Sequence, residues 1–197
     1  MTPEGARAAT TLPMDYFDRL YSENPDPWRF RTSAYEREKY EATLAALRPE
    51  RYARGLEVGC SIGVFTRLLA DRCERLLAID GSRIALAQAR LSCAACSGVV
   101  LEQRTVPAGF PEGCFDLVVL SEVLYYLAPD DLDRLAERCA EALAPHGEVI
   151  LCHWLGETDY PLSGREASDR FAGAMLKRLP TRTILKQEAY RLERLSD

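Results

Sequence analysis

The chain has 197 residues and a net charge of −5, and 47% of its residues are hydrophobic while 28% are charged. This composition is that of an ordinary globular protein, and the length suits one domain with a substantial core. The acidic balance argues against a protein that binds nucleic acid by neutralising phosphates, and it favours a small or cationic partner.

Location and redox chemistry can also be predicted. Residues 1–13 lack a basic segment followed by an apolar one, and no apolar run approaches the roughly 18 residues that span a bilayer. We therefore expect a cytoplasmic protein without membrane association.

The 7 cysteines are irregularly spaced, and no second pair accompanies Cys93 and Cys96. We predict neither a metal site nor a disulfide framework, and simple packing at a helix end for this pair.

The N-terminal quarter predicts a helical cap. Residues 1–12 are small and polar and are expected to be disordered, whereas residues 14–48 carry two helical patterns separated by a proline-rich turn. One face of the first helix would carry Tyr16, Phe17, Leu20 and Tyr21, and one face of the second would carry Tyr35, Tyr40, Leu44 and Leu47.

From residue 52 to residue 195, strand and helix patterns alternate. Strands are expected at 55–58, 75–79, 99–102, 115–120 and 148–154, helices at 65–72, 82–90, 130–143 and 166–179, and one or two further strands at 183–195. The continuous apolar run of the fourth strand is typical of a parallel strand covered on both faces. The sequence therefore predicts an α/β fold, a doubly wound and mostly parallel Rossmann-like sheet in one domain with the helical cap.

The turn after the first strand is the most informative segment. Glu57 lies in that strand, Gly59, Ser61 and Gly63 follow it, and the second strand ends in Asp80. Small residues let backbone N–H groups approach a ligand, and an acid at the end of the second strand can accept hydrogen bonds from ribose hydroxyls. This arrangement predicts a nucleotide-type site.

Charge and glycine spacing select the cofactor. The glycines do not follow the G-x-G-x-x-G pattern of dinucleotide sites, which argues against an NAD-dependent oxidoreductase, and the P-loop pattern is absent. An acid directly before the turn, Glu57, would repel a pyrophosphate. S-adenosyl-L-methionine (SAM) carries an adenosine, a sulfonium and an ammonium but no phosphate, so SAM is the predicted cofactor.

These segments resemble class I SAM-dependent methyltransferases in the motifs at 57–63, 79–82 and 115–124. A closer resemblance, to the nodulation protein S family of rhizobial chitooligosaccharide N-methyltransferases, covers about residues 14–195 and rests on the segments 26–40, 121–127 and 153–164. The resemblance implies methyl transfer to a small molecule, with the amine of an amino sugar or glycoside as the first hypothesis. Two alternatives stay open: an O-methyltransferase of secondary metabolism and a catalytically silent SAM-binding module.

The resemblance and the expected sheet edge together suggest the site residues. The cofactor-binding candidates are Trp28, Arg31, Glu57, Gly59, Ser61, Gly63, Asp80, Gly81, Ser82, Arg104, Thr105, Ser121 and Glu122. Tyr125 and Tyr126 are expected to face the acceptor, and His153 and Asp159 are the candidates for removing its proton.

Two positions depart from the methyltransferase pattern. Ser61 occupies the position where many members have a glycine, and a serine is tolerable there if its backbone keeps an ordinary φ. After the third strand, Arg104 and Thr105 occupy the approximate position of the acidic residue that usually contacts the adenine. The sequence does not determine the acceptor, the number of methyl groups added or the oligomeric state.

Overall fold

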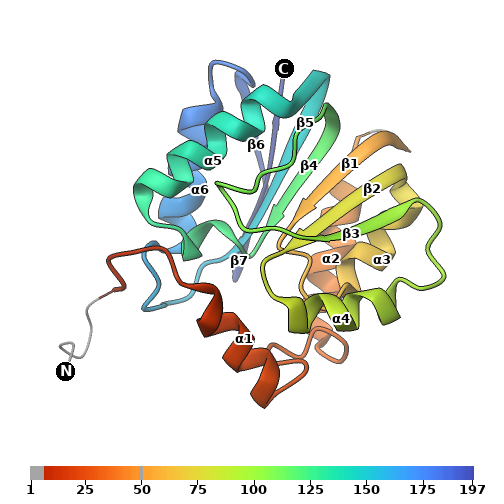
Figure 1. Cartoon of the computed structure of the whole chain (residues 1–197). Coiled ribbons are helices and arrows are strands. Elements are labelled where there is room, and N and C mark those ends of the chain that lie inside the picture. Colours follow the sequence, from red (N-terminus) through yellow and green to blue (C-terminus); the bar gives the residue numbers. More distant parts are fainter. Residues whose placement is uncertain (1–6, 49–50) are drawn as a thin grey trace.

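The computed structural model of the protein describes residues 7–48 and 51–197. In this part of the chain, strands β1 to β7 form one sheet in the order β3-β2-β1-β4-β5-β7-β6 (Figure 1). The strands are β1 (Tyr52–Val58), β2 (Cys73–Asp80), β3 (Val99–Gln103), β4 (Phe115–Ser121), β5 (Leu143–Trp154), β6 (Thr181–Gln187) and β7 (Tyr190–Ser196). The helices are α1 (Met14–Glu23), α2 (Ala34–Ala46), α3 (Val64–Leu69), α4 (Arg83–Ser92), α5 (Pro129–Ala142) and α6 (Gly164–Met175), with short 3₁₀ helices η1 (Ala70–Arg72) and η2 (Leu124–Tyr126).

The sheet confirms the predicted doubly wound topology. β1 lies between β2 and β4 and is parallel to both, and β3 and β5 extend the parallel part on either side. β7 is antiparallel to β5 and to β6, so the last two strands form a hairpin at the edge. The order of strands reverses between β1 and β4, and open α/β sheets bind ligands at the carboxyl ends of their strands at such a point.

Helices cover both faces of the sheet (Figure 1). α5 and α6 pack on one face, where Leu132, Leu135 and Phe171 join a core cluster with β4 and β5. α2 and α3 pack on the opposite face, where Tyr40 and Phe65 stack with ring centroids 5.0 Å apart. These two cores hold the parallel strands rigidly, so the loops at their carboxyl ends have a fixed support.

The helical cap forms as predicted, although α2 buries a different face. In α1, Phe17 and Tyr21 pack against the β1–α3 loop and α4. In α2 the buried residues are Glu36, Lys39, Tyr40, Thr43 and Ala46, whereas Tyr35 and Leu44 are only partly buried. The apolar pattern alone therefore missed two buried charged residues, Glu36 and Lys39, which pair with each other, while Lys39 also pairs with Glu122 from elsewhere in the fold.

Two expectations about irregular segments need correction. Residues 7–12, expected to be disordered, are held by backbone N–H groups of Ala8 and Leu12 that donate to carbonyls of Asp159 and Tyr126 at 2.8 and 2.9 Å; residues 1–6 lie outside the described residues. The predicted helix at 130–143 and strand at 148–154 leave a gap between them, but β5 already begins at Leu143, directly after α5. Leu143 pairs with Phe115 of β4, and the register then shifts.

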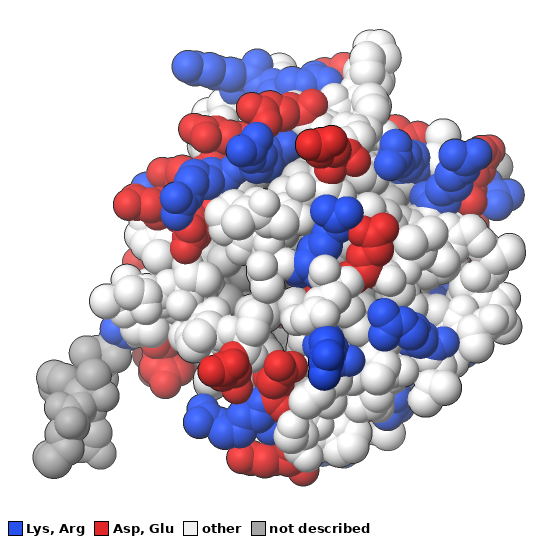
Figure 2. Space-filling view, in the orientation of Figure 1, with Lys and Arg blue, Asp and Glu red and all other residues white. Residues whose placement is uncertain are grey.

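The surface in Figure 2 mixes acidic and basic side chains, most densely over α5 and α6, and shows no continuous basic patch on this face. Among the described residues, no helix has both the length and the apolar character that crossing a bilayer requires. All seven cysteines are free, and Cys114 is exposed. The described residues contain no cluster of three or more potential metal ligands.

Candidate functional site

A cavity of about 390 Å³ opens at the carboxyl ends of β1, β2, β4 and β5. α1 and α2 and the segment between them supply its outer wall, with side chains such as Phe17, Tyr21, Trp28 and Tyr35. We refer to the wall near Glu57 and Asp80 as the β2–β1 side. We refer to the wall near Glu122 and Trp154 as the β4–β5 side.

The β1–α3 loop is shaped by left-handed backbone conformations. Gly59 and Gly63 have φ values of 81° and 78°. A Cβ on Gly63 would lie 2.9 Å from the Cα of Ala89, so this glycine allows α3 and α4 to approach closely. Gly59 lines the cavity, whereas Gly63 does not; it supports the loop from behind.

Ser61 does not keep the ordinary φ expected of it. Its φ is 52°, a conformation that non-glycine residues rarely adopt. Two contacts hold it there: its N–H donates to Asp80 Oδ2 at 2.8 Å, and its hydroxyl hydrogen-bonds the Tyr21 hydroxyl at 2.5 Å. The second of these contacts connects the Ser61 side chain to α1, which carries Tyr21.

Asp80 ends β2 and organises the β2–β1 side. Its two carboxylate oxygens accept hydrogen bonds from the N–H groups of Ser61 and Ser82, each at 2.8 Å. Burial raises the pKa of this carboxyl, and these backbone hydrogen bonds oppose that effect. Each oxygen receives one hydrogen bond from these residues, and a carboxylate oxygen can accept two, so capacity remains for ligand hydroxyls.

Glu57 is the second acid on this side. It is 4% exposed, and its Oε2 atom is buried without a hydrogen-bond partner. Burial raises the pKa of its carboxyl to about 7, although the neighbouring Thr66 hydroxyl opposes this effect. A buried acceptor without a partner is costly, so a cationic or N–H-bearing ligand in the cavity would stabilise this residue.

Glu122 dominates the β4–β5 side. It follows β4 with a φ of 55°, and its Oε1 atom lies 2.7 Å from Lys39 Nζ of α2. Its Oε2 atom accepts from the Tyr125 hydroxyl at 2.6 Å and from the Trp154 N–H at 2.9 Å. Although burial opposes ionisation, Lys39 and the other donors lower the Glu122 pKa, so the carboxyl is ionised.

Aromatic rings complete the cavity beside Glu122. Tyr125 and Tyr126 both line it, and their ring centroids are 4.6 Å apart. Tyr160 stacks on Tyr125 at 5.4 Å, and Phe17 of α1 packs on Tyr126 at 4.8 Å. This apolar wall excludes water from the region between the two acidic sides.

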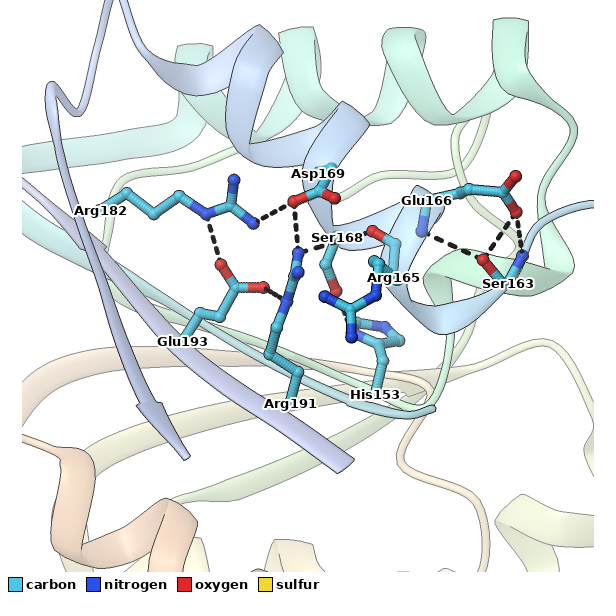
Figure 3. Close-up of polar contacts among 9 residues, drawn as sticks. All are labelled: His153, Ser163, Arg165, Glu166, Ser168, Asp169, Arg182, Arg191 and Glu193. Atoms are coloured by element: carbon cyan, nitrogen blue, oxygen red, sulfur yellow. Dashed lines mark hydrogen bonds and ion pairs between the residues drawn. The ribbon is translucent and has the colours of Figure 1, made fainter. Parts of the chain in front are cut away.

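His153 does not occupy the position expected of a proton acceptor. It is fully buried, and Figure 3 shows it extending from β5 toward α6. Its Nε2 atom accepts from the Leu124 N–H at 3.2 Å, and its Nδ1 atom lies 3.3 Å from the Ser168 hydroxyl. Burial lowers the pKa of the ring to about 4. His153 is therefore neutral and lies outside the cavity wall, because its place in β5 faces α6.

The surroundings of His153 are a structural network. Arg191 and Glu193 of β7 are buried and paired at 2.5 Å, and Arg182 of β6 and Asp169 of α6 join them (Figure 3). These pairs hold the C-terminal hairpin of β6 and β7 against α6. None of the four residues lines the cavity.

Most of the predicted cofactor residues do line the cavity, namely Trp28, Glu57, Gly59, Ser61, Asp80, Gly81, Arg104, Thr105, Ser121 and Glu122. Others do not. Arg31 is exposed and donates to Gln88 at 2.8 Å, and Ser82 is buried as the N-cap of α4. Asp159, the other candidate for removing a proton, is exposed, and only its backbone carbonyl is engaged. These corrections have one cause: proximity in sequence to a motif does not fix the direction of a side chain.

Sequence reasoning missed the residues that α2 brings to the cavity. Glu36 and Lys39 lie one helical turn apart and form an ion pair at 2.8 Å. Their spacing is a common surface pattern. The signal that could have distinguished them is their position on the same helix face as Tyr40 and Thr43.

Comparison with known proteins assigns the fold and the family. The family model described as nodulation protein S (NodS) matches residues 17–153. The chain belongs to the NodS family. The crystal structure of the N-methyltransferase NodS from Bradyrhizobium japonicum WM9 with S-adenosyl-L-homocysteine (SAH) superposes with a TM-score of 0.75 and 25% identity, over 93% of this chain and 97% of that one. The predicted class I methyltransferase fold is confirmed.

Two nodulation protein S sequences illustrate the relationship within the NodS family. The protein of Bradyrhizobium diazoefficiens is 40% identical over 52% of this chain and 49% of its own length. That of Sinorhizobium fredii is 35% identical over 64% of this chain and 59% of its own length. The chain thus matches only about half the length of these relatives.

Proposed function

We propose that the protein is a SAM-dependent methyltransferase that modifies the amine of a small acceptor of the amino-sugar or glycoside type. One observation carries the proposal: the β2–β1 side presents Asp80, with hydrogen-bonding capacity left, beside the unpartnered carboxylate oxygen of Glu57. Membership of the NodS family and the likeness to NodS with bound SAH support it. We also propose that residues 1–197 act as one domain, with residues 14–48 as its helical cap and residues 52–195 as its α/β core.

The charge of the cavity fits SAM better than a phosphate-bearing nucleotide. The wall carries the acids Glu36, Glu57, Asp80 and Glu122 and the bases Lys39 and Arg104. Lys39 is paired with two of these acids, and Arg104 is paired at 2.6 Å with Glu102. The wall therefore offers no unpaired cation to a phosphate, while the sulfonium and ammonium of SAM would meet acidic surroundings.

Individual residues would hold separate parts of SAM. Asp80 would accept from the ribose hydroxyls, Glu57 would accept from the ammonium, and Thr105 would border the adenine with its neighbour Val106. Trp28 and Tyr21, whose rings lie 5.6 Å apart, would cover the cofactor from the cap. On binding, the ammonium would give the buried Glu57 oxygen a hydrogen-bond partner and so remove the free-energy penalty of leaving that oxygen unpaired.

SAM, when bound, would supply an electrophilic methyl carbon: a neutral acceptor nitrogen would bond to that carbon as the carbon–sulfur bond breaks, SAH would leave, and the methylated nitrogen could then lose a proton to water. The protein's part is to place the acceptor in line with that carbon and to keep water away. The tyrosines of the β4–β5 side provide the water-excluding wall. Positioning of this kind contributes much of the acceleration in such transfers.

Binding tests the cofactor. Calorimetry is expected to give micromolar affinity for SAH and no heat for NAD. Binding of NAD without SAH would overturn the proposal.

Mass spectrometry tests the acceptor. A panel of β-1,4-linked glucosamine oligomers and hydroxylated aromatics, incubated with SAM and the protein, is expected to gain one or more methyl groups on the amino sugars. Methylation confined to the hydroxylated aromatics would instead favour the O-methyltransferase alternative.

A further inference from the structure

A cluster of charged residues on the β4–β5 side is given no direct contact with the cofactor in the site described above. It consists of Glu36 and Lys39 of α2 and of Glu122 after β4, and Tyr35 lies beside it. All four residues line the cavity. The cluster joins the cap to the sheet on the side of the cavity that the proposed cofactor contacts leave free.

Lys39 is shared between two carboxylates. Its side chain is 2% exposed, and its ammonium lies 2.8 Å from Glu36 and 2.7 Å from Glu122. Burial would lower the Lys39 pKa, but the two acids outweigh burial and raise it, so the lysine is charged. The cluster therefore contains one acid more than it has bases, in surroundings where an unbalanced charge is expensive.

The cluster also has unused hydrogen-bonding capacity. Glu122 Oε2 already accepts two hydrogen bonds, whereas Lys39 is the one donor that the described residues give to Oε1. The Tyr35 hydroxyl is buried without a partner, and its ring lies 5.2 Å from the Lys39 ammonium. The cluster thus holds one buried hydroxyl without a partner, that of Tyr35, and one carboxylate oxygen, Glu122 Oε1, that can accept a further hydrogen bond.

The cluster is far enough from Asp80 to serve a second ligand. β1 separates β2 from β4 in the sheet, so the ends of β2 and β4 are two strand intervals apart, roughly 10 Å. A cofactor held through its ribose at Asp80 and its ammonium at Glu57 leaves Glu122 for the acceptor.

We propose that Glu122, held in place by Lys39, is the residue that binds the acceptor's amino group, with Glu36 supplying the second acid and Tyr35 a hydrogen bond to a neighbouring polar group. The acceptor would bind as an ammonium, and its nitrogen would react as the neutral amine after one proton has passed to water. The proposal rests on the proposed function and adds a specificity: the acceptor is selected for nitrogen over oxygen. A cation at this place balances the surplus acid, whereas a hydroxyl does not.

A purely structural ion pair between cap and sheet is the competing explanation. One acid would suffice for it, and it would leave neither the open position on Glu122 nor the unpartnered Tyr35 hydroxyl beside it. The two explanations differ in what they predict for ligand binding, since a structural pair affects all ligands through stability alone.

The test measures binding of glucosamine and of glucose to the SAH-loaded protein, with the Glu122→Gln variant beside the wild type. Glutamine keeps the size and an acceptor oxygen for Lys39 but removes the charge. We expect the wild type to bind glucosamine at least tenfold more tightly than glucose, and Glu122→Gln to lose about tenfold or more of the glucosamine affinity with SAH affinity unchanged.

Glu148→Gln is the matched control. Glu148 is a buried acid of β5 that pairs with Arg48 and Tyr52 away from the cavity. This variant should lose stability without changing the preference for glucosamine. Equal binding of the two sugars by the wild type, or unchanged glucosamine binding by Glu122→Gln, would overturn the inference. Failure of SAH to bind the wild type would instead overturn the proposed function.

Discussion

The two sides of the cavity are built in different ways. The β2–β1 side comes mainly from one continuous stretch, residues 57–82, in which strand, loop and strand end follow each other. The β4–β5 side joins α2, the end of β4 and the end of β5, which are far apart in the chain. The first side is a motif that can be read in a short sequence window. The second exists only after the chain has folded.

The largest expected effect concerns Asp80, the centre of the β2–β1 side. Asp80→Ala removes the acceptors for two backbone N–H groups and for the ribose hydroxyls, so SAH affinity is expected to fall about 100-fold or more by calorimetry. Asp116→Ala is the matched control, because Asp116 also accepts from two backbone N–H groups, those of Ala53 and Arg54, at the start of β1. Equal losses in the two variants would remove Asp80 from the binding site.

Glu57 gives a pH-dependent prediction for the same side. Its carboxyl pKa is raised from 4.5 to about 7 in the folded protein, so the folded state binds the proton more tightly than the unfolded state. This contribution to stability is complete below pH 4.5 and is lost as pH rises to 7, with a total of about 3 kcal/mol.

Glu57→Gln removes this titration. Relative to the wild type, the variant should gain stability between pH 5 and pH 8 by roughly that amount in chemical denaturation. A stability difference that does not change over this range would mean that Glu57 is ionised at low pH and already partnered.

On the β4–β5 side, His153 supports the turn that carries Tyr125 and Tyr126. His153→Phe leaves the buried Leu124 N–H without its acceptor, which is expected to cost about 1–3 kcal/mol of unfolding free energy. Acceptor binding should weaken while SAH binding is retained. The exposed His146 is the control, since His146→Ala should change stability by less than about 0.5 kcal/mol. Loss of SAH affinity in His153→Phe would show that the two sides are not independent.

Arg31 should give the smallest effect. Its side chain is exposed and paired with Gln88, away from the wall of either side. Arg31→Ala is therefore expected to change SAH affinity by less than about threefold, in calorimetry beside Asp80→Ala. A larger loss would mean that the cap closes further over the cofactor and brings Arg31 to it.

Much of the fold could be predicted because its signals are local. The predicted strands and helices agree with β1 to β5 and α3 to α6 apart from their ends, since each repeats its apolar pattern within a few residues. The backbone of Ser61 could not be predicted, because its left-handed φ depends on Asp80 and Tyr21. His153 was misjudged for a similar reason: alternation along β5 does not tell which face the cavity occupies.

The sequence by itself determined the sheet, the glycine-containing loop, the acid at the end of β2 and the NodS family, because these depend on residues close together in the chain. Only the tertiary structure decided which polar groups share the cavity. Lys39 pairs with Glu122, which lies 83 residues further along the chain. His153 lies beside Ser168 of α6 instead of in the cavity wall. Such pairings depend on how helices and strands pack, and burial then sets the charge and hydrogen bonding of each group.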